Sequence, residues 1–451
     1  MRETVALQPP LVAAPFAHPH VGELTAIDAI LNELPGVAEL VYEDLVRGLT
    51  NPKVGRKGMS AEQVLRVLLV KQMTGFSYDQ LVFHLGDSSA YRSFCKLGFA
   101  DAAPAKPTLK RNLKRVRAET LEKVHWLVVE VATERGVEKG RKVRFDCTVT
   151  ETNIHAPSDS TLLWDGVRVL VRAMTRAQQW VSVSFRDSTL RAKRRAVAIQ
   201  YAKTNKARRK LYKDLRRVTS TTVERAEVVA AALETCEVLD PIAFVRVQGL
   251  GAELRHYVGL TRKVLEQTRR RIDCGEHVPA KDKVVSIFEP HTDVIVKDRR
   301  DTLYGHKLCF ATGASGLVLD CRIEDGNPAD STLAIEMVKR QGDIFDRVPR
   351  QVAFDGGFAS KANLRELKEL GVADVMFNKK RGLEVPEMTK SERVYKGLRN
   401  FRAGIEAGIS YLKRCFGLDR CTWRTLRSFK AYTWASVLAA NLLTLARHLL
   451  P

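Results

Sequence analysis

The chain has 451 residues, 45% of them hydrophobic, so it is long enough for two or three domains and is not an intrinsically disordered protein. Its 74 lysines and arginines exceed its 52 aspartates and glutamates, which gives a formal charge of +22 at pH 7. This excess favours a polyanionic partner, nucleic acid first, although ribosomal proteins and proteins of anionic membranes share it.

The cysteines and the chain ends argue against several other classes. The eight cysteines are scattered and contain no C-x-x-C pair, which favours reduced thiols in a cytoplasmic protein. Residues 1–22 hold four prolines and no long apolar run, so we expect a flexible segment and no signal peptide. Asn441 and Arg447 interrupt the apolar segment 434–450, where we expect a buried helix and no membrane anchor.

Residues 23–140 carry helical patterns throughout. Capping boxes begin at Ser60 and Ser77, a short helix follows Ser88, and one long helix is predicted from Pro107 to Ala132. Short helices followed by a basic one predict a helix-turn-helix-like DNA-binding domain. An ordinary helical bundle with a solvated basic face is the alternative. The expected DNA contacts are the cations in the first turns of the long helix, Lys110, Arg111, Lys114 and Arg115.

At Lys142 the pattern changes from helix to strand. Four apolar residues from Val143 to Val149 alternate with polar ones, which places Asp146 on the opposite face of the strand. An acid in that position either lies in solvent or serves a site.

Residues 161–282 form a helical insertion with a strongly basic part. Thirteen lysines and arginines lie between Arg186 and Arg217, against Asp187 and Asp214. Such a run predicts either a solvated helix or a contact with the DNA backbone. Three aromatic residues of the insertion fit either core packing or stacking on an unpaired base: Trp164, Trp180 and Tyr212.

Strand patterns return after the insertion. Strands are predicted at 284–288 and 293–297, followed by a hairpin of 304–312 with 316–324, and then by a helix. The apolar run 351–354 ends at Asp355, and two glycines follow, which is where α/β sheets place ligand-binding groups. A helix and a strand then precede a long helix that includes residues 399–416.

That last helix carries Arg402, Glu406 and Lys413 on one face, beside an apolar stripe. Taken alone, this face is typical of weak ion pairs in solvent. With Asp146 and Asp355 it completes a set of three acids from three elements.

The order of elements predicts an α/β fold: an RNase H-like catalytic core with a mixed sheet, in residues 141–160 and 283–451, interrupted by the insertion. In that topology Asp146, Asp355 and Glu406 converge. Clustered carboxylates repel one another without cations, so we expect two Mg²⁺ or Mn²⁺ ions there. Other acids compete for the role of second ligand: Glu289, Asp293, Asp301 and Asp330. Three histidines fit turn or hairpin packing better than metal binding: His155, His291 and His306.

The chain resembles bacterial insertion-sequence transposases of the DDE type, most closely the group catalogued as ISNCY, and more distantly families with the signature Y-x₂-R-x₃-E-x₆-K. The resemblance rests on segments along nearly the whole chain: LVKQMTGFSYDQL, YRSFCKLGF, FDCTVTETNIHAPSDSTLLWDGVRV, EPHTDVIVKDRR, YGHKLCF, GNPADSTL, FDGGFAS and R-x₃-E-x₆-K. Arg399 stands where the signature has tyrosine, and Phe358 replaces the tyrosine of a commoner D-x-G-Y motif.

The resemblance implies that Asp146, Asp355 and Glu406 are the catalytic acids and that Arg402 and Lys413 are the signature cations, which would contact DNA phosphates. It implies metal-dependent cleavage and strand transfer at the terminal inverted repeats of an element, a target DNA and a homodimer on two ends, in the bacterial cytoplasm near the nucleoid. An RNase H-like nuclease without strand transfer and a transposase-derived DNA-binding protein without catalysis remain alternatives.

Overall fold

In the computed structural model of the chain, the described residues are 4, 18–52, 54–55, 57–98, 100–297, 301–378 and 382–450. They form two compact units, one from residues 1–152 and 306–451 and the other from residues 153–305. Each unit has its own hydrophobic core. The predicted insertion lies inside the second unit, whose borders are wider than 161–282.

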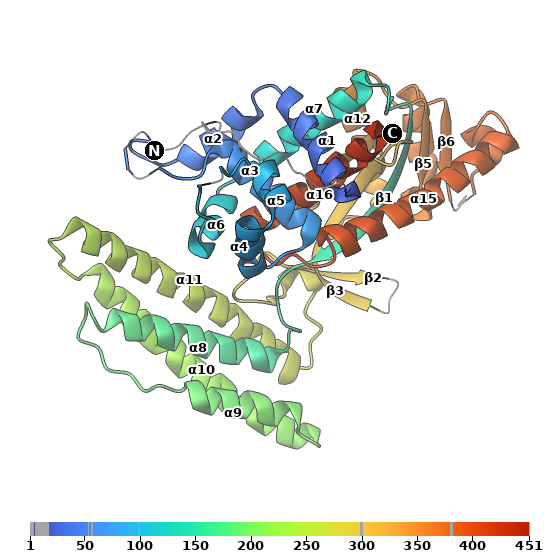
Figure 1. The fold of residues 1–451 in the computed structure, drawn as a ribbon. Helices are drawn as coiled ribbons and strands as arrows, with labels where there is room; N and C mark the ends of the chain where they lie inside the picture. The colour runs from blue at the N-terminus through green and yellow to red at the C-terminus, as the bar shows by residue number, and fades with distance from the viewer. Residues whose placement is uncertain are drawn as a thin grey trace. The chain divides into compact units, whose positions relative to one another are not determined.

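Seven helices of the first unit precede its sheet (Figure 1). They are α1 (Pro19–Glu33), α2 (Val37–Val46), α3 (Ala61–Thr74), α4 (Tyr78–Asp87), α5 (Ser89–Phe94), α6 (Lys106–Leu113) and α7 (Ala118–Glu134). Both predicted capping boxes are present, at Ser60 and Ser77. The flexible segment was predicted to reach residue 22, but α1 already begins at Pro19. Proline suits the first position of a helix, because an N–H group there would have no partner within the helix. Residues 1–3 and 5–17 of that segment lie outside the described residues.

The long basic helix predicted from Pro107 to Ala132 is two helices, α6 and α7. Residues 114–117 form a turn in which the Arg117 amide donates to Asp44 Oδ2, at 2.8 Å. The buried carboxylate of Asp44, on α2, therefore begins α7 in a new direction, and a local helical pattern cannot reveal such a tertiary contact.

A mixed sheet follows α7 in the first unit. Its strands are β1 (Lys142–Glu151), β3 (Asp301–Thr312), β4 (Val318–Ile323), β5 (Gln351–Phe354) and β6 (Asp374–Phe377). The order is β3-β1-β5-β6, with β4 antiparallel to β3, so the predicted hairpin is confirmed. β1 runs parallel to β5, and β5 parallel to β6.

Helices of the C-terminal half complete this unit. They are α12 (Asp330–Phe345), α13 (Lys361–Glu369), α14 (Val385–Met388), α15 (Glu392–Phe416) and α16 (Leu426–Leu449). α15 packs on β1, β5 and β6, whereas α16 packs against α1, α3 and α7 (Figure 1). The N-terminal helices therefore share one core with the sheet. No helix among the described residues is both long and apolar enough to span a bilayer.

The second unit is mainly helical. It contains α8 (Asp159–Ala177), α9 (Thr189–Gln200), α10 (Asn205–Glu234), α11 (Pro241–Ile272) and β2 (Asp293–Lys297), which pairs with the start of β3. The strand predicted at 284–288 is absent. Instead, the Gln267 side chain donates to the C=O of Val284 and accepts from its N–H. The apolar side chains of Val284 and Ile287 pack in the core of the second unit.

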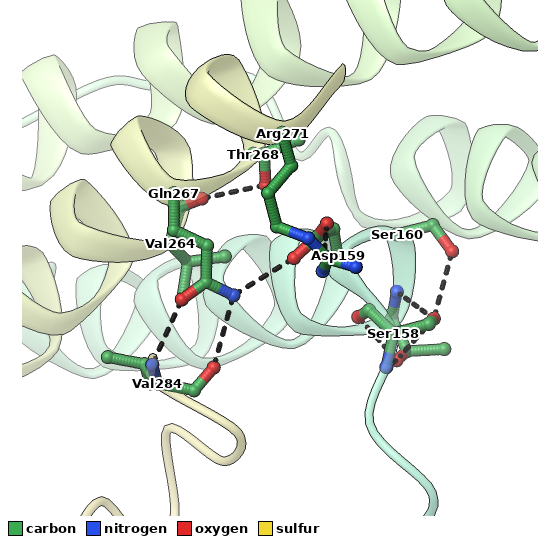
Figure 2. Close-up of polar contacts among 9 residues, drawn as sticks. Ser158, Asp159, Ser160, Val264, Gln267, Thr268, Arg271 and Val284 are labelled. Atoms are coloured by element: carbon green, nitrogen blue, oxygen red, sulfur yellow. Dashed lines mark hydrogen bonds and ion pairs between the residues drawn. The ribbon is translucent and has the colours of Figure 1, made fainter. Parts of the chain in front are cut away.

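Figure 2 shows how one buried acid joins the helices of the second unit. Asp159, in the first turn of α8, accepts from Gln267 Nε2 at 2.9 Å and from Arg271 Nη1 at 2.7 Å. Because Gln267 also holds Val284, this one carboxylate fixes the start of α8 to the end of α11 and to the segment that follows it.

A second buried polar cluster lies in the first unit. His125, on α7, contacts the carbonyl of Leu319 through Nε2 and the side chain of Asn441 through Nδ1, both at 3.3 Å. Asn441 also pairs with the backbone N–H and C=O of Val318. The polar residue that interrupts the apolar segment 434–450 therefore links α16 to α7 and β4. Burial lowers the pKa of His125 to about 4.

Asp159→Asn should loosen the helices of the second unit, because hydrogen bonds to a charged group contribute about 1.5–3 kcal/mol each. We expect faster amide hydrogen exchange in α8 and α11. Glu253→Gln is the matched control, since Glu253 forms an exposed ion pair with Arg176 on the same helices and should have little effect. Equal exchange in both variants would contradict this role.

The His125 imidazole should make the chain less stable in acid. The pKa of His125 is lowered in the folded state, so between pH 6.5 and about 4 the imidazole is protonated only in the unfolded chain. Stability therefore decreases as the pH is lowered through that window. His125→Gln should reduce the drop in the urea midpoint between pH 7 and pH 5. His448→Gln, at an exposed position, should not reduce it. An unchanged drop in the His125 variant would refute the prediction.

Candidate active site

Two of the predicted acids are neighbours because of strand register. Phe145 on β1 pairs with Phe354 on β5, and their rings stack at 4.7 Å. The next residue in the sequence is an aspartate in both cases, Asp146 within β1 and Asp355 directly after β5. Since successive side chains alternate between the two faces of a sheet, both acids leave the phenylalanine layer and lie on the face that α15 covers.

A contact between β1 and α15 brings the third acid to this place. Arg144 shares the face of Asp146 and donates from Nη1 to the Phe401 carbonyl at 2.8 Å and from Nε to Thr312 Oγ1 at 3.0 Å. The helix approaches so closely that a Cβ atom on Gly404 would lie 2.2 Å from Arg144 Nη1. Glycine at 404 leaves room for the Arg144 guanidinium against α15, two residues before Glu406.

Arg402 lies at the centre of the three acids. Its Nη2 is 3.1 Å from Asp146 Oδ2 and 3.2 Å from Asp355 Oδ1, and its Nη1 is 2.9 Å from Glu406 Oε1. Arg402 is only 8% exposed, so this is not the solvated ion-pair face that the helix suggests alone. One buried guanidinium thus collects carboxylates from β1, from the end of β5 and from α15.

The three carboxylates differ in their surroundings. The side chain of Asp146 is 15% exposed, that of Asp355 38% and that of Glu406 65%. Burial raises the pKa of Asp146 to about 6, and the neighbouring charges of Asp355 and Asp330 add to this, whereas Arg402 and the Cys147 amide oppose it. At Asp146, burial therefore outweighs the opposing charge of Arg402.

A fourth acid, Asp330, lies beside the site in the first turn of α12. It forms an ion pair with Lys307, and a Cβ atom on Gly357 would lie 2.6 Å from its Oδ2. Gly357 follows Asp355 by two residues, so this glycine leaves room for Asp330 next to the end of β5. Of the acids that compete for the role of second ligand, Asp330 thus lies next to the site, but its carboxylate is paired with Lys307.

The donor set fits a hard divalent cation. Carboxylate oxygens are the ligands that Mg²⁺ and Mn²⁺ prefer, and two of the three carboxylates are open to solvent. Within the described part of the chain, Arg402 Nε is buried without a hydrogen-bond partner, so the guanidinium is incompletely satisfied where it lies. However, no three His, Cys, Asp or Glu side chains among the described residues are close enough to hold one ion. This includes the three acids around Arg402.

The other predicted contact residues lie apart from the three acids. Lys413, on α15, is 3.9 Å from Asp419 Oδ1, and Arg399 is exposed one turn before Arg402. The cations of α6 and the turn after it form a separate basic surface: Lys110, Arg111 and Lys114 are exposed, and Arg115 donates to the carbonyl of Arg47.

The remaining candidates make local contacts. Glu289, Asp293 and Asp301 belong to the second unit, where Glu289 contacts His291 at 2.9 Å. His155 lies 3.5 Å from Asp165 Oδ2, and the buried His306 packs edge-on against Phe429. The three aromatic residues of the insertion pack in or against the core of the second unit: Trp164, Trp180 and Tyr212.

Two residues of the site, Arg144 and Gly404, were not predicted from the sequence. Arg144 carried a usable signal, because it stands two residues before Asp146 and so shares its face of β1. Gly404 carried none, since a glycine within a helix shows a close approach only when the partner strand is known.

Two family models match parts of the chain. Residues 21–115 match the family model described as Transposase domain (DUF772), and residues 289–442 match the Transposase DDE domain. No curated protein and no solved structure matches the chain. The second match includes Asp355, Glu406 and the helix that carries Arg402, and the first covers most of the helices before β1. The chain therefore belongs to the DDE-type insertion-sequence transposases.

Proposed function

We propose that this transposase cuts the phosphodiester backbone at the ends of its element and joins the ends to target DNA, with Asp146, Asp355 and Glu406 as ligands of two Mg²⁺ or Mn²⁺ ions. One observation carries the proposal. Three acids far apart in the sequence meet at one buried guanidinium, at the carboxyl end of a buried parallel strand. Membership of the ISNCY group is part of the same proposal.

We assign the catalytic core to the RNase H-like class. The assignment is supported by the strand order β3-β1-β5-β6 with β4 antiparallel to β3, and by α15 lying across β1, β5 and β6. It is also supported by the place of the acids, one within the first strand, one after the fourth strand of this set in sequence, and one on the following long helix.

The side chains of the site have separate tasks in this proposal. Asp146, Asp355 and Glu406 hold the ions, which when bound would supply charge neutralisation and Lewis-acid chemistry for phosphodiester displacement. Arg402 serves as counter-ion of the acids before an ion arrives, and then turns to a phosphate of the cleaved strand. Arg144 and Gly404 act through α15, by fixing the position of Glu406 over β1.

The N-terminal helices are proposed to bind the terminal inverted repeats. Lys110, Arg111 and Lys114 are exposed on and just after α6, within the matched transposase domain. Because these helices share a core with the sheet, we expect end recognition and catalysis to depend on one folded body. Two ends must be held together for strand transfer, so the proposed working form is a homodimer on DNA at the bacterial nucleoid.

Two alternatives differ in a measurable way. A nuclease would cut element ends without joining them to a second duplex. A DNA-binding regulator without catalysis would not cut at all, and the presence of all three acids around Arg402 argues against it.

Asp355→Asn should abolish Mg²⁺-dependent cleavage of duplexes that carry the DNA flanking the gene, while leaving their binding intact. Loss of a ligand removes several kcal/mol of transition-state stabilisation, so we expect at least about a 10³-fold lower rate. Glu392→Gln, at an exposed acid in the first turn of α15, should cleave normally. Normal cleavage by the Asp355 variant would refute the site, and cutting by the wild type without joining would favour the nuclease.

Arg402→Met should bind Mn²⁺ more tightly in the absence of DNA, because no guanidinium then competes for the three carboxylates. We expect affinity to rise about tenfold, equivalent to about 1.4 kcal/mol, seen as a larger Mn²⁺-dependent rise in the unfolding temperature. Cleavage should fall in the same variant. Arg399→Met, at the exposed arginine one turn earlier, is the control and should respond to Mn²⁺ like the wild type. A weaker response in the Arg402 variant would contradict the counter-ion role.

A further inference from the structure

We propose that the N-terminal half of α10 is a contact surface for the phosphate backbone of duplex DNA, separate from the N-terminal helices and from the acids. The inference rests on the proposed function, since it concerns the DNA on which the transposase acts. The surface is a stripe of five cations, called the α10 stripe: Lys206, Arg209, Lys210, Lys213 and Arg217.

The α10 stripe occupies one face of the helix. Its residues follow one another at i, i+3, i+4, i+7 and i+11, and all five are exposed. The opposite face of the same turns is buried in the core of the second unit and includes Tyr212, Leu215 and Val218. The stripe is therefore fixed in direction by the packing of α10 and presents its charges along a straight line of about 16 Å.

The acids of this unit leave the stripe uncompensated. Asp214, the one acid on the first half of α10, pairs with Arg191 and Arg195 of α9. None of the five stripe residues has an ion-pair partner among the described residues. Four arginines of α11 differ, because each is paired with a glutamate: Arg255, Arg262, Arg269 and Arg270.

This arrangement opposes helix stability. Like charges four residues apart, such as Lys206 with Lys210 and Arg209 with Lys213, destabilise a helix. Cations near a helix N-terminus also meet the positive end of the helix dipole. In the second half of α10 the charges are mixed, with Glu224 and Glu227 near Arg225. The repulsion is thus concentrated in the N-terminal half of α10, where a bound polyanion would reduce it.

The chemistry of the stripe selects duplex DNA among polyanions. An anionic membrane requires an apolar face beside the cations, and single strands are held by stacking aromatic side chains. The exposed residues of α10 between positions 205 and 217 include no aromatic and no large apolar side chain. A straight row of about 16 Å corresponds to about five base-pair steps along a duplex, where phosphates are regularly spaced.

The test compares two full-length variants that lose the same charge from the same unit. The stripe variant carries glutamine at four positions: K206Q, R209Q, K210Q and K213Q. The control variant carries glutamine at the four paired arginines: R255Q, R262Q, R269Q and R270Q. Affinity for a random-sequence 40-base-pair duplex is measured by fluorescence anisotropy over a range of NaCl concentrations, with circular dichroism to compare helix content.

The stripe variant should lose about 3–4 from the slope of log affinity against log salt, and at least about tenfold in affinity near 0.1 M salt. The control should stay within about threefold of the wild type. Equal binding by the stripe variant and the wild type, or an equal loss in both variants, would overturn the inference and leave the proposed function standing. A wild-type chain that binds no duplex would overturn the proposed function and the inference with it.

A measurement on the unmodified protein guards against misfolding of the variant. Acetylation of the wild type with and without the duplex, followed by mass spectrometry, should show at least a threefold protection of Lys206, Lys210 and Lys213. Lys263, an exposed lysine of α11, should react equally in both samples. Equal acetylation of the stripe lysines with and without DNA would overturn the inference.

Discussion

The parallel pairing of β1 with β5 is the constraint on which the site depends. With Phe145 opposite Phe354, the two aspartates that follow lie at the same level and on the same face. A slip of one residue would move one aspartate into the phenylalanine layer and one phenylalanine toward α15. The stacked rings of Phe145, Phe354 and Phe377 extend this layer across three strands, so apolar packing fixes the register that the acids need.

The three carboxylates of the site repel one another, and the positive charge of Arg402 offsets part of this repulsion. The guanidinium offers two nitrogens to three acids, which allows the cluster to form without an ion. Burial nevertheless raises the pKa of Asp146 to about 6, and Arg402 Nε has no hydrogen-bond partner among the residues that the structure describes. In the proposed function, divalent cations would relieve the remaining repulsion among the three carboxylates.

Local patterns predicted much of this fold, and the failures have tertiary causes. Alternation placed Asp146 on the correct face of β1, and an apolar run followed by glycines placed Asp355 at a strand end. The break between α6 and α7 depends on Asp44 from α2, and the segment 284–288 is held by Gln267 from α11. Neither partner is near in sequence. The same limit applies to Arg402, because helical spacing shows Glu406 as its partner but gives no sign of Asp146 and Asp355.

The most direct test of the central claim is to map where a divalent cation binds the full-length protein. Fe²⁺ in place of Mg²⁺, with ascorbate and peroxide, cuts the polypeptide near the bound metal, and mass spectrometry locates the cuts. We predict cuts close to Asp146, Asp355 and the segment Arg402–Glu406, which excess Mg²⁺ suppresses and Asp146→Asn removes. Cuts confined to other acids, such as those near Glu289 and Asp293, would contradict it.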